Sequence, residues 1–98
     1  MGPIYGTMRA SRDWLIQQGV DSEKASYLIT KQYLGGVQEA GLNMDDPHRL
    51  DDLIAEQTAG GLNAQALDNL DQLGGLKAQQ KIMDKILERI RGASDGSL

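Results

Sequence analysis

The sequence predicts an all-α fold of about five helices. Apolar residues recur with the 3.6-residue period of an amphipathic helix along almost the whole chain of 98 residues. No segment alternates polar and apolar residues for long enough to predict a β-strand. Glycine, proline and capping residues interrupt the helical pattern, and these interruptions separate the predicted helices from one another.

The first two helices are predicted in the amino-terminal half. The first runs from Pro3 to about Gln18 with Gly19 as its stop, and it is expected to turn inward Ile4, Met8, Leu15 and Trp14. Asp21 is a good N-cap for the second helix, because a carboxylate can accept a hydrogen bond from a free first-turn N–H group. That helix carries the apolar residues Ala25, Leu28, Ile29, Tyr33, Val37 and Ala40, and it is expected to end near Gly41 and Asn43.

Three further helices are predicted after it. A short third helix begins at Pro47, the favoured first helical position, and carries Leu50, Leu53 and Ile54. Asn63 is the expected N-cap of the fourth helix, which ends at Gly74-Gly75 and places inward Ala66, Leu67, Leu70 and Leu73. The fifth ends before Gly92 and carries an apolar stripe of Leu76, Ile82, Met83, Ile86, Leu87 and Ile90. Residues 1–92 are therefore expected to form one helical domain, followed by a flexible tail of residues 93–98.

Composition excludes several classes of protein. A formal net charge of −4 argues against nucleic-acid binding, which needs a surplus of Lys and Arg. The absence of cysteine excludes disulfides, thiolate metal sites and cysteine nucleophiles. The sequence shows neither a membrane-spanning apolar run nor a signal peptide, so a cytoplasmic protein is expected. His48 is the single histidine and lacks companions at ligand spacing, so it is interpreted as a solvated first-turn residue and no metal site is expected.

A pair of glycines inside the second predicted helix points to association. Each glycine in a helix interior costs about 1 kcal/mol relative to alanine, so Gly35-Gly36 needs a reason. Close approach of another backbone is one reason, and a kink in a monomeric bundle is the alternative. The chain also has few large side chains for five helices, which favours an interface with a second copy.

Several short motifs occur in an order that resembles a known family. They are Met1-Gly2-Pro3-Ile4-Tyr5, Gly19-Val20, Ala25 to Leu28, Leu34-Gly35-Gly36, Thr58-Ala59-Gly60-Gly61-Leu62-Asn63 and Gly74-Gly75. In this order the chain resembles, from Gly2 to about Arg91, the carboxy-terminal dimerisation domain of pyrroline-5-carboxylate reductase, an enzyme of proline synthesis. The resemblance implies a helical domain like the carboxy-terminal domain of 6-phosphogluconate dehydrogenase, intertwined with a second copy as a homodimer that can assemble further.

The resemblance also implies a substrate loop. The loop would bind the carboxylate of a cyclic imine through Thr58, Gly60, Gly61, Leu62 and Asn63, with Asn63 where the family has a catalytic threonine. Pro3 and Tyr5 would line the cleft toward the NADP or NAD that binds on an amino-terminal Rossmann domain. That domain is absent from this chain, which is expected to be inactive alone.

This chain departs from the family motif in two places, and other functions therefore stay open. Ala59 replaces the family's proline, and Asn63 replaces its threonine. One alternative is a paralogous reductase for a different imine or keto acid. The other is a free-standing helical module that dimerises or binds a partner helix.

Overall fold

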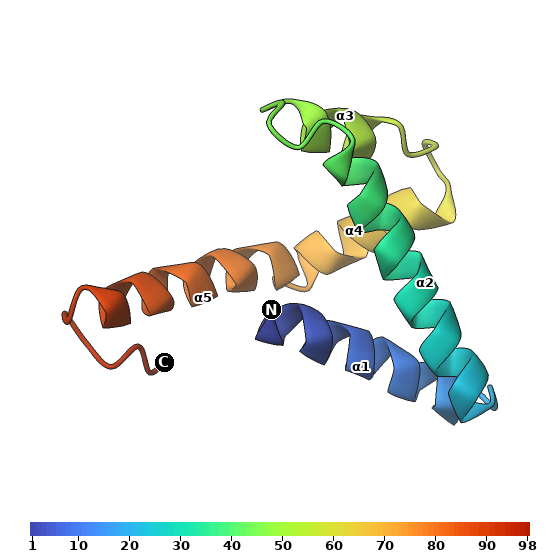
Figure 1. Cartoon of the computed structure of the whole chain (residues 1–98), viewed down its shortest axis with the longest axis horizontal. Helices are drawn as coiled ribbons and strands as arrows, with labels where there is room; N and C mark the ends of the chain where they lie inside the picture. Colours follow the sequence, from blue (N-terminus) through green and yellow to red (C-terminus); the bar gives the residue numbers. More distant parts are fainter. The chain divides into compact units, whose positions relative to one another are not determined.

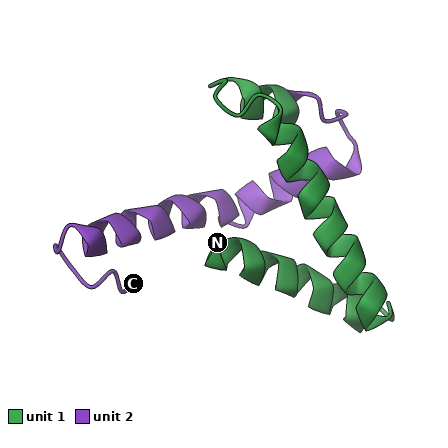
Figure 2. Ribbon diagram, viewed as in Figure 1, with its two compact units in different colours: residues 1–54 green, residues 55–98 purple.

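The computed structural model describes all 98 residues and contains five α-helices and no strand, which confirms the predicted all-α class (Figure 1). The helices are α1 (Gly2–Gln17), α2 (Ser22–Gly41), α3 (Arg49–Ala55), α4 (Leu62–Gln72) and α5 (Gly75–Ile90). The chain divides into two compact units, residues 1–54 and residues 55–98, which Figure 2 colours separately. No helix has both the length and the apolar character needed to cross a membrane.

The first unit is built on a hairpin of α1 and α2. Gly19 adopts a left-handed φ of 97° after α1, where a glycine is favoured, so the predicted stop is confirmed. The Asp21 carboxylate accepts a hydrogen bond from the backbone N–H of Lys24 at 3.3 Å, which confirms the predicted cap of α2. The turn between α1 and α2 is thus specified by Gly19, which ends the first helix, and by Asp21, which begins the second.

The core of the hairpin is small. Ala25 and Ile29 of α2 are the buried apolar residues of the chain, and Met8 and Leu15 of α1 are half-buried. Trp14, which was expected to face inward, is 58% exposed, and Ile4 is 43% exposed. The expectation was wrong for these two because α1 packs on one helix only. A single neighbour covers a narrow stripe, and side chains at its edges stay in solvent.

The third helix begins two residues later than predicted. Residues 46–48 form a turn in which the Asp46 carboxylate accepts a hydrogen bond from the backbone N–H of His48 at 2.9 Å. This aspartate therefore caps a turn rather than the helix, and α3 starts at Arg49. The Arg49 guanidinium donates to the backbone carbonyl of Glu39 at 2.9 Å and lies 3.3 Å from its carboxylate, which ties α3 to the end of α2.

The second unit consists of α4, α5 and the carboxy-terminal residues. Gly74 adopts a φ of 82° between the two helices, and a Cβ at Gly75 would collide with the side chain of Leu70. The elbow therefore needs glycine at both positions, one for its backbone angle and one for space. Gly92 has a φ of 73° after α5, which confirms the predicted stop.

Residues 93–98 carry no helix or strand, and the side chain of Ser94 bonds back to α5. The Ser94 hydroxyl donates to the Glu88 carboxylate at 2.9 Å, and Lys85 donates to the same oxygen at 3.3 Å. These two hydrogen bonds, with that of Ser94 first in effect, hold the pKa of Glu88 below its ordinary value.

Candidate functional site

The loop between α3 and α4 has the backbone of a tight turn. Gly60 adopts a left-handed φ of 76°, and the backbone N–H of Gly61 donates to the carbonyl of Thr58 at 2.9 Å. A Cβ at Gly61 would lie 3.0 Å from that carbonyl oxygen and 3.4 Å from the Cβ of Thr58. The two glycines are therefore required for different reasons, Gly60 for its φ and Gly61 for the close approach of Thr58.

Most of the predicted loop residues meet at one depression. It has a volume of about 390 Å³, and its walls include Thr58, Gly61, Leu62 and Asn63. Gly60 was predicted with these four, but it lies on the turn and does not line the depression. The first turn of α4 forms one side of this space.

The role expected of Asn63 as a helix cap is wrong. The fourth helix begins at Leu62, its N-cap is Gly61, and no side chain caps it. The turn closed by the hydrogen bond from Gly61 to Thr58 leaves Gly61 in the extended conformation of an N-cap, and the helix begins at the next residue. Asn63 therefore lies within the first turn with its amide free of a capping role. First-turn N–H groups of a helix lack helical acceptors and carry the positive end of the helix dipole.

Two residues of this depression were not predicted. Glu56 and Gln57 also line it, immediately before Thr58 in the sequence. The sequence signal that could have indicated them is their position directly before the loop. The Glu56 carboxylate lowers the positive potential that the end of α4 provides, so it opposes binding of an anion and favours a ligand that also carries a positive group.

The residues expected near a cofactor lie in the other unit. Pro3 is in the first turn of α1, where its carbonyl accepts a hydrogen bond from the Thr7 hydroxyl at 2.8 Å. Tyr5 is 61% exposed and lines a small pocket between α1 and α2. The ring of Tyr5 is therefore accessible to a ligand.

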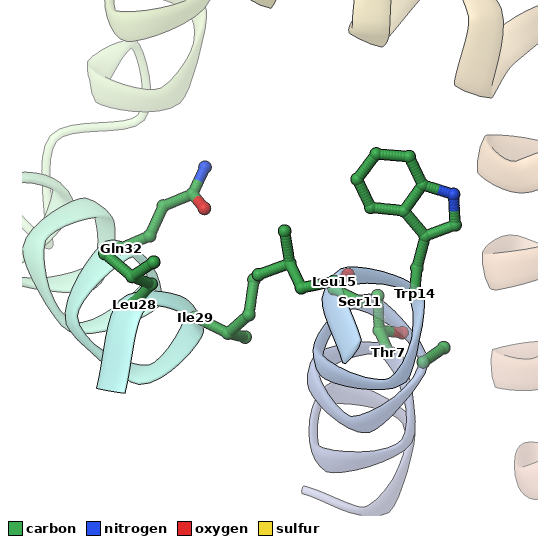
Figure 3. Close-up of a pocket in the computed structure, with 8 residues that line it drawn as sticks. Thr7, Ser11, Trp14, Leu15, Leu28, Ile29 and Gln32 are labelled. Carbon is green, nitrogen blue, oxygen red and sulfur yellow. The ribbon is translucent and has the colours of Figure 1, made fainter. Parts of the chain in front are cut away.

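The hairpin also carries an open apolar groove. Figure 3 shows its lining residues, with Leu15 and Ile29 between the helices and Trp14 projecting from α1 beside them. The groove has a volume of about 680 Å³. Leu28, on its α2 side, is 50% exposed. A second face of α2 also exposes apolar side chains. Tyr27 and Leu34 on this face are more than half exposed, beside Ser26 and Lys31.

The fifth helix also exposes its apolar side chains. Every member of its predicted apolar stripe is at least 39% exposed, and Ile90 reaches 76%. The side chains do form one stripe, but nothing in the second unit covers it. The inner face predicted for α4 is also largely uncovered, with Leu67 half-buried and Leu73 87% exposed.

The exposed area can be compared with that of compact proteins. Two separate compact globules with the sizes of these units would together expose about 6,600 Å², by the usual scaling of area with mass. The chain exposes 8246 Å². The excess, about 1,600 Å² on one chain by this scaling, is about twice the roughly 800 Å² that each partner contributes to a standard protein interface.

No cluster of three or more His, Cys, Asp or Glu side chains is arranged to hold a metal ion. The His48 ring is 78% exposed, with its Nδ1 atom 4.0 Å from the Asp51 carboxylate. The exposed ring agrees with the solvated residue that the sequence predicted, but His48 lies in the turn before α3 and not in the first turn of the helix.

In comparisons with known proteins, no family model, no curated protein and no solved structure matches the chain.

Proposed function

We propose that this chain is a homodimerising helical domain. The observation that carries the proposal is the exposure of apolar residues on both sides of α2 and along α5, with two buried apolar residues in the whole chain. A helix that is apolar on several faces is typical of a buried helix, and α2 is covered on one side only. A second copy supplies matching surface, because each copy exposes the same stripes.

Sedimentation of a charge variant tests the dimer. Leu34 is 55% exposed on the outer face of α2, and we expect Leu34→Glu to shift the chain toward monomer. Asn43→Asp adds the same charge at an exposed position in the turn after α2, outside the helices, and it is expected to leave the dimer intact. A wild-type chain that stays monomeric at high concentration would refute dimerisation. Equal behaviour of the two variants would refute the assigned surface.

We further propose that this domain serves a reductase that acts on a cyclic imine, as the resemblance to pyrroline-5-carboxylate reductase implies. The gathering of Thr58, Gly61 and Asn63 at one depression supports this proposal. The first turn of α4 would bind the substrate carboxylate through its free N–H groups, and the Asn63 amide would donate a further hydrogen bond. NADP or NAD, held by a separate domain of the parent protein, would supply the hydride.

Leu62 and Asn63 favour a second candidate, a paralogous reductase with another substrate. Leu62 is 85% exposed and has no hydrogen-bonding group, and the side chain of Asn63 is longer than that of threonine. Exchange of Asn63 for threonine in the full-length parent, followed by kcat/KM over a panel of cyclic imines, distinguishes the two. A changed order of substrates would support the paralogue, and an unchanged order would exclude Asn63 as a specificity residue.

The loop itself is tested by Gly61→Val in the full-length parent. A side chain at this position meets the Thr58 carbonyl, so we expect imine reduction to be lost while the dimer persists. Retained activity would remove the loop from the substrate site.

A further inference from the structure

One pocket on the hairpin is lined by hydrogen-bond donors in an otherwise acidic protein. Tyr5, Arg9 and Arg12 of α1 line it together with Ser26 and Thr30 of α2, over the apolar side chains of Met8 and Ile29. These positions follow from helix geometry, because residues spaced by three and four lie on one face of a helix. The pocket therefore combines two guanidinium groups with three hydroxyls, and no carboxylate lines it.

The charges around this pocket leave it positive. The Nε and Nη2 atoms of Arg12 both donate to one oxygen of Asp13, at 2.9 and 2.7 Å. Asp13 thus neutralises Arg12, while Arg9 takes part in none of the ion pairs of the chain. Arg9 lines the pocket and is exposed, and its side chain has no competing ion-pair partner. Its guanidinium can therefore contact an anion in the pocket.

We propose that this pocket binds a phosphoryl group, either as free phosphate or as a phosphate monoester. Guanidinium groups match the geometry and charge of phosphate oxygens, and hydroxyls add further donors. The pocket has a volume of about 200 Å³, below the range of pockets that hold drug-sized ligands, so it fits a small tetrahedral anion rather than a whole dinucleotide. This proposal does not rest on the proposed reductase, and its residues Ser26 and Thr30 also line the face of α2 that carries Leu34.

The binding chemistry predicts a weak, salt-dependent site. Both arginines are partly exposed, and exposed charge pairs are weakened by solvent and by salt, so we expect a dissociation constant of roughly 1–10 mM. Arg9 carries the charge that Asp13 does not neutralise. Its replacement is therefore expected to weaken binding more than replacement of any arginine outside the pocket.

Amide chemical shifts of the full chain, titrated with inorganic phosphate at constant ionic strength, test the proposal. We expect saturable shifts at Arg9, Ser26 and Thr30, and binding about fivefold weaker in Arg9→Gln. Arg91→Gln is the matched control, because Arg91 is an exposed arginine at the other end of the sequence. Circular dichroism of both variants verifies that the helices are retained.

Two further probes define the ligand. Glycerol phosphate that shifts the same amides would assign the site to phosphate monoesters as well, and binding of inorganic phosphate alone would restrict it to the free anion. Acetate at the same concentration is expected to cause no saturable shift. The proposal is overturned if phosphate shifts do not saturate, if acetate matches phosphate, or if Arg9→Gln binds phosphate as tightly as Arg91→Gln.

Discussion

Replacement of Gly35 and Gly36 by alanine separates a dimer contact from an incidental pair of glycines. Both residues lie inside α2 with negative φ, and no heavy atom lies within 4 Å of a Cβ added at either position. Alanine therefore fits without strain in the isolated chain. Each exchange is expected to stabilise the helix by about 1 kcal/mol, so the double variant gains about 2 kcal/mol in the monomer.

The sign reverses if a second backbone crosses α2 at these glycines. Two added methyl groups would hold the helices apart, and overpacking of a close contact costs about 1–3 kcal/mol. In a symmetric dimer both copies carry the change, so the dissociation constant is expected to rise by about tenfold or more. The double variant would then be a more stable monomer and a weaker dimer.

Sedimentation over a wide range of concentration measures the dimer, and thermal unfolding at low concentration measures the monomer. Gly6→Ala is the matched control, because Gly6 also lies inside a helix with open space around its Cβ position. A double variant that dimerises as tightly as the natural chain would refute a crossing at Gly35-Gly36. The glycines would then merely weaken α2.

Three smaller perturbations test local features of the chain. Gly60→Ala places a side chain at a φ of 76°, and urea unfolding is expected to show a loss of about 1–2 kcal/mol, whereas no loss would mean that the loop adopts another conformation. Asp21→Ala removes the cap of α2 and is expected to cost about 1 kcal/mol in the same assay; an unchanged midpoint would count against the hydrogen bond to Lys24. The Glu88 pKa is lowered in the folded chain, so the contact with Ser94 stabilises the tail above the ordinary carboxyl pKa and is lost as pH falls through the lowered value. In an NMR titration Ser94→Ala is expected to raise the Glu88 pKa and to leave that of Asp95 unchanged, and a Glu88 pKa that does not move would assign the shift to another group.

Much of the local structure could be predicted because it depends on neighbours in sequence. Asp21, Gly19 and Gly92 each act within one helical turn, and the structure places the ends of the helices where these residues indicate. The start of α3 was predicted two residues early for a similar reason. The Asp46 carboxylate could accept a hydrogen bond either in a turn or at the start of a helix. It accepts from the backbone N–H of His48 in a turn, and the helix begins after it.

The site was predicted in part. Four loop residues gather at one depression because a tight turn and the following helix bring sequence neighbours together. The capping role of Asn63 was wrong because a turn that ends at Gly61 took the N-cap position. Glu56 was missed because the motif begins at Thr58 and directed attention to the residues from there onward.

The sequence by itself determined that this chain is helical, where its helices stop, and which apolar side chains share a face. Only the tertiary structure decided which of those faces are covered: α1 shields Ala25 and Ile29, while the stripe of α5 stays in solvent. Helix ends follow from hydrogen bonds and backbone angles within a few residues. Burial depends on which surfaces pack against each other, and a periodic pattern identifies an apolar face without specifying its partner.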